Sequence, residues 1–132
     1  MRTICTRWDE AQLPPDTEWR MWRQLRGAYG IDVFNVTPIV PVMSGVSIGH
    51  FSTMEECLDA STGIRIFFEP DGDCALSDIP SGDKVLVFGN TNQGNGHLSR
   101  PEDICVKIPS LNPTDLYGVN AAAIVLHYLH GQ

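Results

Sequence analysis

Residues 85–95, with the sequence VLVFGNTNQGN, contain the pattern that decides the fold. The apolar run 85–88 predicts a buried strand, and the polar glycine loop 89–95 ends it. A second apolar run, 104–108, ends at Pro109, and a further polar loop leads into an apolar helix over 118–129. We expect the two strands to end side by side. Ligands of open α/β sheets bind outside the carboxyl ends of strands, so these loops are the predicted binding site.

The same kind of pattern extends toward the N-terminus. Apolar strand-like runs alternate with segments of helical spacing, which predicts an α/β fold with a mostly parallel sheet and helices on both faces. The further predicted strands are 3–6, 31–36, 46–48 and 64–68, and the further predicted helices are 18–30 and 52–60.

Capping residues mark both of those helices. Asp16 or Thr17 is the predicted cap of the first helix. For the second, a capping box pairs either Ser52 with Glu55 or Thr53 with Glu56. The first helix places Trp19, Trp22, Leu25 and Ala28 at helical spacing, which predicts a core-facing stripe.

Length, composition and charge limit the classes of protein to which this chain can belong. The 132 residues suit one domain, 1–132, with 42% hydrophobic residues and a net charge of −7. No apolar run reaches the ~20 residues of a membrane span, and the N-terminus lacks the pattern of a signal peptide, so we expect a cytoplasmic location. The charge argues against a general basic nucleic-acid binder.

Positive charge is nevertheless concentrated at one end. Arg2, Arg7, Arg20, Arg23 and Arg26 are more than half of the nine Lys and Arg residues. An anionic partner is therefore expected to approach the N-terminal segment. The alternative is that these arginines form an ordinary solvated helix face.

Cysteine and histidine spacing gives no metal pattern. Cys5, Cys57, Cys74 and Cys105 contain no CxxC pair, so we expect reduced, structural thiols and no metal site. The four histidines are scattered, and His97, in the loop after the predicted strand 85–88, is a possible general base or an ordinary surface residue.

Taken together, these elements resemble the C-terminal half of the SPOUT class of RNA methyltransferases. Their order is a strand, Phe-Gly with a polar loop, a second strand, Ile-Pro, another polar loop and an Ala-rich helix. The resemblance extends upstream through Pro14-Pro15-Asp16-Thr17, the Arg23 helix and residues 52–60. It implies a C-terminal trefoil knot, an exception to the rule that chains are unknotted. The implied branch is the ribose 2′-O-methyltransferases, in a minimal form.

The resemblance also implies roles for particular residues. S-adenosylmethionine would be the cofactor, bound by Phe88, Gly89, Asn90, Gly94, Ile108, Pro109, Leu116 and Ala122. Arg23 would be the basic residue near the methyl acceptor, and Tyr117 and Asn120 would orient that acceptor. The RNA substrate, tRNA or rRNA, would approach the Arg-rich first helix. The family also implies a homodimer packed through the last helix.

The sequence departs from the family pattern at three places. Thr91 occupies a position where active members have Glu, Gly118-Val119-Asn120 replaces Asn-x-Ser, and Glu18 stands in a stretch that usually has Asn. Three hypotheses follow: an RNA 2′-O-methyltransferase, a catalytically weak or inactive module that binds cofactor or RNA, and an unrelated small flavodoxin-like domain.

Overall fold

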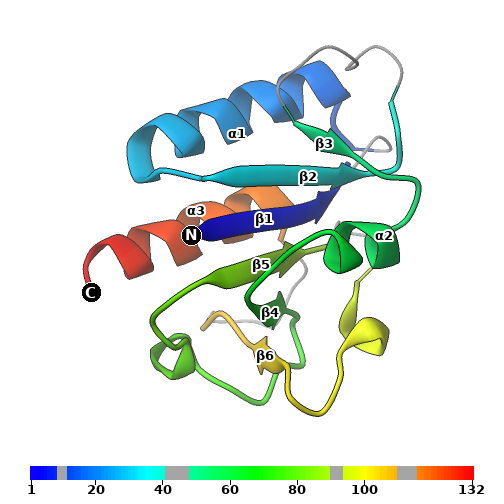
Figure 1. The fold of residues 1–132 in the computed structure, drawn as a ribbon. Coiled ribbons are helices and arrows are strands. Elements are labelled where there is room, and N and C mark those ends of the chain that lie inside the picture. Colours follow the sequence, from blue (N-terminus) through cyan, green and yellow to red (C-terminus); the bar gives the residue numbers. More distant parts are fainter. Residues whose placement is uncertain (9–11, 41–47, 90–93, 110–115) are drawn as a thin grey trace.

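The computed structural model describes residues 1–8, 12–40, 48–89, 94–109 and 116–132. Within these ranges the chain forms one sheet of parallel strands in the order β3-β2-β1-β5-β4-β6 (Figure 1). The strands are β1 (Arg2–Arg7), β2 (Val33–Thr37), β3 (Gly49–His50), β4 (Ile64–Phe68), β5 (Lys84–Phe88) and β6 (Ile104–Val106). The prediction of a parallel α/β sheet is confirmed.

Helices cover both faces of the sheet. On one face α1 (Pro15–Tyr29) and α3 (Gly118–His130) pack over Ile4, Leu86 and Phe88. On the other face α2 (Met54–Asp59) packs over Cys5, Val85 and Val87. Because successive strand residues point to opposite faces, β1 and β5 each supply both cores, and Val85–Phe88 of β5 is therefore apolar throughout.

The first helix begins earlier than predicted. Its first residue is Pro15, and its N-cap is Pro14, with no side-chain capping bond, so the prediction of Asp16 or Thr17 as cap is wrong. Proline suits the first helical position because its φ is already helical and it has no N–H to leave unpaired. The predicted core stripe holds at Trp19 and Trp22, which are buried, and fails at Ala28, which is exposed.

The second helix confirms one half of the predicted Thr53–Glu56 capping box. Thr53 is the N-cap, and its Oγ1 accepts a hydrogen bond from the Glu56 backbone N–H at 3.2 Å. Such a cap contributes about 1 kcal/mol to helix stability.

Several predicted strands differ by one or two residues from the observed ones; β2, for example, is Val33–Thr37 rather than 31–36. β6 ends at Val106 rather than at residue 108. The predicted strand 46–48 lies mainly outside the described residues, and the short strand β3 begins at Gly49 instead. None of the helices in the described ranges has both the length and the hydropathy that a membrane span requires.

Most apolar residues of α3 are buried within this chain. Val119, Ala122, Val125 and Leu126 are buried against the sheet and α1, whereas Ile124 is 43% exposed. The apolar surface that α3 leaves exposed is therefore small and centres on Ile124.

Candidate functional site

The carboxyl edge of the sheet gathers the ends of β1, β4 and β5, with β4 between β5 and β6. The expectation that the strands 85–88 and 104–108 end side by side is therefore wrong. Lateral order is set by crossover connections, which sequence order does not reveal. The residue that follows β4, Glu69, consequently takes part in this edge.

The start of α3 sits directly against the end of β5. A Cβ on Gly118 would lie 2.8 Å from the carbonyl oxygen of Gly89, 3.2 Å from Thr6 Oγ1 and 3.4 Å from Phe88 Cβ. Only a residue without a side chain permits this approach of helix to strand end. The last helix thus packs beside the strand end that precedes the 89–95 loop, as the family resemblance requires.

A hydrogen-bonded network joins three segments on the α2 side of this edge. Arg7 Nε donates to Asn95 Oδ1 at 2.8 Å, and the Asn95 backbone N–H donates to Glu69 Oε1 at 2.6 Å. A Cβ on Gly94 would lie 2.7 Å from Glu69 Oε2. The network fixes the far end of the 89–95 loop to the ends of β1 and β4.

Several buried side-chain groups near this edge have no hydrogen-bond partner among the described residues. Thr6 Oγ1 and Asn95 Nδ2, on two fully buried residues, are among them. Since a buried polar group without a partner costs about 1–3 kcal/mol, native structures rarely retain one without a reason. Both groups therefore indicate that an additional polar partner belongs at the strand ends.

Arg7 is a charged residue in a partly desolvated position. Burial lowers the pKa of its guanidinium, while attraction to groups around it, including the Glu69 and Glu55 carboxylates, acts in the opposite direction. Arginine nevertheless stays protonated in proteins, so Arg7 is a fixed positive charge at the site.

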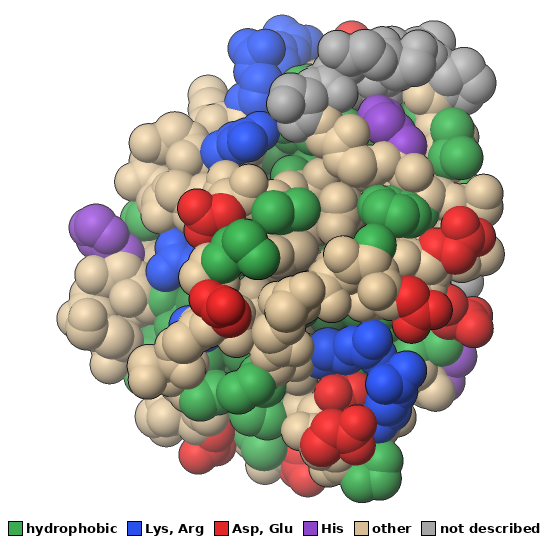
Figure 2. Space-filling view, in the orientation of Figure 1, with side chains coloured by type: hydrophobic (Ala, Val, Ile, Leu, Met, Phe, Trp, Pro, Cys, Tyr) green, Lys and Arg blue, Asp and Glu red, His purple; other side chains and the backbone are tan. Residues whose placement is uncertain are grey.

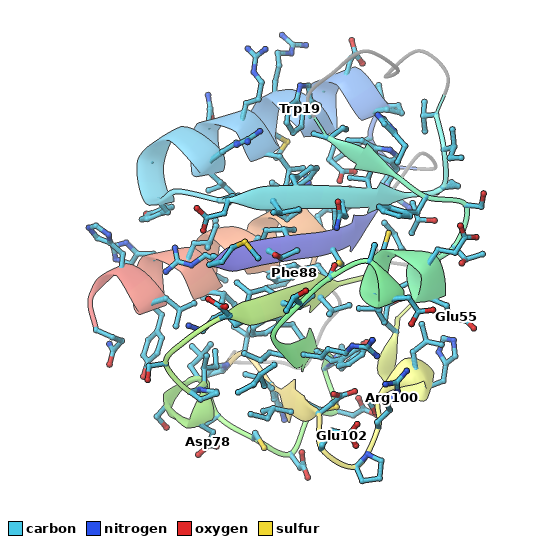
Figure 3. The ribbon with its side chains drawn as sticks, in the orientation of Figure 1. Trp19, Glu55, Asp78, Phe88, Arg100 and Glu102 are labelled. Atoms are coloured by element: carbon cyan, nitrogen blue, oxygen red, sulfur yellow. The ribbon has the colours of Figure 1, made fainter. Side chains whose placement is uncertain are left out.

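The residues predicted to bind cofactor fall into different environments. Phe88 is buried in the core, where its ring stacks on that of Phe68 with 4.8 Å between the ring centroids. Figure 3 shows Phe88 on the central strands. Gly89 and Gly94 lie at the edge, and the atom facing Gly94 belongs to Glu69. Asn90, like Thr91, lies outside the described residues.

The cofactor-binding residues predicted in the last third of the chain differ in exposure. Ile108 and Leu116 are half-buried, Pro109 is exposed, and Ala122 is buried within α3. Ile108 and Pro109 follow the end of β6 and are separated from β5 by β4.

The three predicted catalytic residues are not joined to one another by any hydrogen bond or ion pair within the described ranges. Arg23 and Asn120 are exposed on α1 and α3, and Tyr117 Oη donates to Gln12 Oε1 at 3.4 Å. His97, the possible base, is exposed in a short 3₁₀ turn, Gly96–Leu98.

Positive charge gathers over α1, at the top of the view in Figure 2. Arg20 and Arg23 are exposed there at i, i+3 spacing. Arg2 belongs to the opposite edge, where its Nη1 donates to the Tyr29 carbonyl at 3.1 Å. The N-terminal arginines are therefore dispersed, and only part of the predicted basic segment forms a surface on α1.

Sequence reasoning missed Arg7, Glu69 and Asn95 as a unit. Glu69 and Asn95 are 26 residues apart, and Arg7 and Asn95 are 88 apart. Only the position of each residue was visible in the sequence. Arg7 and Glu69 directly follow predicted strands, and Asn95 ends the glycine loop.

The described residues hold no cluster of three or more potential metal ligands. All four cysteines are free, as predicted, with Cys5 and Cys57 buried and Cys74 and Cys105 half-buried.

Solved structures similar to this chain include RNA methyltransferases and proteins described as methyltransferases. One, studied for the 2-OH methylation of C/U34 on tRNA, is 16% identical with a TM-score of 0.70, over 99% of this chain and 94% of its own. A second is the SpoU methyltransferase AviRb of Streptomyces viridochromogenes in complex with AdoMet, 16% identical with a TM-score of 0.74, over 98% of this chain and 57% of its own.

A third is described as a probable methyltransferase of Bordetella pertussis Tohama I, 17% identical with a TM-score of 0.65, over 98% of this chain and 92% of its own. No protein-family model and no curated protein sequence matches the chain. The chain thus has the fold of SpoU-type RNA methyltransferases. Its strand order also differs from the 2-1-3-4-5 order of flavodoxins, which removes the third hypothesis.

Proposed function

We propose that this chain is an S-adenosylmethionine-dependent RNA methyltransferase of the SPOUT class, acting on a ribose 2′-hydroxyl of tRNA or rRNA. The observation that carries the proposal is the fold. The likeness extends over 99% of this chain and 94% of a protein studied for 2-OH methylation of tRNA. We further propose that the chain is a single domain with a C-terminal trefoil knot and that it works in the cytoplasm.

The chemistry of the carboxyl edge fits the cofactor. AviRb has this fold and is seen with AdoMet, and here Thr6 Oγ1 and Asn95 Nδ2 are buried at the strand ends without a described partner. The close contact of Gly118 with Gly89 brings the α3 backbone to the same place. Gly89, Gly94, Ile108, Pro109 and the start of α3 would hold the cofactor largely through main-chain groups.

S-adenosylmethionine supplies an activated methyl group, so the protein's task is to align the acceptor and to help remove its proton. We assign Arg23 to the acceptor's side, since it is exposed on α1 beside Arg20. Tyr117 and Asn120 flank the start of α3, where their polar groups would orient the ribose.

The second hypothesis, a binding module without turnover, is favoured by one specific observation. Arg23, Tyr117 and Asn120 are not linked to each other in the described residues, and Tyr117 is hydrogen-bonded to Gln12.

A homodimer packed through α3 at Ile124 is the arrangement in which a second copy would complete the acceptor site.

The test is incubation of the purified protein with radiolabelled S-adenosylmethionine and RNA from its source cell. Label in a ribose 2′-O-methyl group supports the enzyme. Cofactor binding without any transfer to RNA would contradict the enzyme and leave the binding module.

A further inference from the structure

Arg7 forms no ion pair with any carboxylate in the part of the chain that the structure describes, and its one side-chain hydrogen bond there is the donation from Nε to Asn95 Oδ1. A guanidinium has five N–H donors in a rigid planar fork, so four remain. Arg7 is also half-buried, which makes unused donors costly.

Asn95 adds further donors beside this fork. Because arginine has no acceptor, the amide atom facing Arg7 Nε must be the oxygen, and this fixes which atom of the Asn95 amide is Nδ2. That Nδ2 carries two N–H donors, is fully buried, and has no acceptor in the described structure. Unused donors therefore exist on both members of the Arg7–Asn95 pair.

The pair is held in place rather than merely adjacent. The Asn95 backbone N–H is bound to Glu69 Oε1 at 2.6 Å, and the Arg7 backbone pairs with Thr37 in the sheet. Glu69 and Glu55 attract Arg7 at longer range, but neither forms an ion pair with it among the described contacts. The acceptors at this place, Glu69 Oε1 and Asn95 Oδ1, hold the pair in position, and its remaining donors and one positive charge are complementary to an oxyanion.

We propose that Arg7, oriented by Asn95 and Glu69, binds an oxyanion at the carboxyl end of β1. This inference rests on the proposed function for the identity of the ligand, which has two sources with the same chemistry. One is the carboxylate of the amino-acid part of S-adenosylmethionine. The other is a phosphate of the RNA backbone.

The experiment begins with the wild-type protein and inorganic phosphate. Titration is followed through the ¹⁵N-labelled side-chain signals of Arg7 Nε–H and Asn95 Nδ2–H₂. The proposal expects both signals to shift in a saturable manner while that of Arg100, an exposed arginine, does not. Signals of Arg7 and Asn95 that do not move would overturn the proposal, and this arm needs neither cofactor binding nor a folded variant.

The second arm separates the two sources with Arg7→Gln and the control Arg100→Gln. If the oxyanion is the cofactor's carboxylate, Arg7→Gln weakens binding of S-adenosylhomocysteine about 10- to 100-fold. It then leaves binding of 5′-methylthioadenosine, which lacks that carboxylate, unchanged. If the oxyanion is an RNA phosphate, affinity for S-adenosylhomocysteine is unchanged, and the salt dependence of RNA binding falls by about one phosphate contact.

Loss of neither ligand in Arg7→Gln, or equal losses in Arg100→Gln, would overturn the proposal. Should the wild-type chain bind no S-adenosylhomocysteine, the proposed function fails while the phosphate titration still decides this inference. Asn95→Asp provides a last check, because its carboxylate would pair with Arg7 and exclude the oxyanion while keeping the shape of the side chain.

Discussion

The contact of Gly118 with Gly89 makes a quantitative prediction. In Gly118→Ala, the new methyl group would lie 2.8 Å from a backbone carbonyl oxygen, which has no flexible side chain to move aside. Overpacking of this kind costs about 1–3 kcal/mol. The gain in helix propensity is at most about 1 kcal/mol, and less at the first residue of α3. We therefore expect net destabilisation.

Gly27→Ala is the matched control, since Gly27 lies in α1, is exposed, and has no heavy atom within 4 Å of the position of a new Cβ. The same chemical change there should stabilise the protein by about 0.5–1 kcal/mol. The assay is urea unfolding followed by the fluorescence of the buried Trp8, Trp19 and Trp22.

The two variants should shift the unfolding midpoint in opposite directions at an unchanged slope. A Gly118→Ala protein as stable as Gly27→Ala would refute the inference that α3 packs tightly on the end of β5. A changed slope in either variant would show that the two midpoints do not report native-state packing alone.

Three further predictions concern function, assembly and the thiols. Arg23→Ala should abolish RNA methylation while leaving S-adenosylhomocysteine affinity within about twofold, because Arg23 is exposed on α1; calorimetry and the labelling assay measure both, and unchanged methylation would contradict its role. Sedimentation at micromolar concentration should show a dimer that Ile124→Glu dissociates, since burying a charge at that 43% exposed position is costly; a wild-type species of only 14.6 kDa would count against it. Alkylation of the native protein should modify Cys74 and Cys105 before Cys5 and Cys57, which are fully buried; mass spectrometry that finds Cys5 modified first would contradict the packing of α2.

Much of the fold was predictable because burial imposes a local pattern. The run Val85–Phe88 is apolar since both of its faces are covered, and such a run indicates a parallel sheet between helices. The cap at Thr53 was predictable for a similar reason, because the bond to Glu56 spans only three residues.

The lateral strand order was not predictable in this way. Nothing in the residues of β4 states that it lies between β5 and β6, because that depends on the crossovers. The start of α1 was also missed, since Pro15 initiates the helix through its fixed φ instead of through a side-chain cap.

The candidate site, like the fold, was predictable only where the local sequence determines the structure. Glycines that allow close backbone approach were visible in the sequence, but their neighbours were not. The contact of Gly94 with Glu69, and the bond of Arg7 to Asn95, arise only when distant strand ends meet at one edge.

Binding of S-adenosylhomocysteine to Gly94→Ala and Gly96→Ala, measured by calorimetry, tests the central claim most directly. A Cβ at residue 94 would lie 2.7 Å from Glu69 Oε2 and displace the carboxylate that holds Asn95, whereas one at residue 96 would make an ordinary 3.7 Å contact with Glu69 Cγ. Loss of a hydrogen bond to a charged group is worth about 1.5–3 kcal/mol. The account predicts wild-type binding by Gly96→Ala and at least about tenfold weaker binding by Gly94→Ala. Equal affinity in both variants, or no binding by the wild-type protein, would contradict a cofactor site at this edge of the sheet.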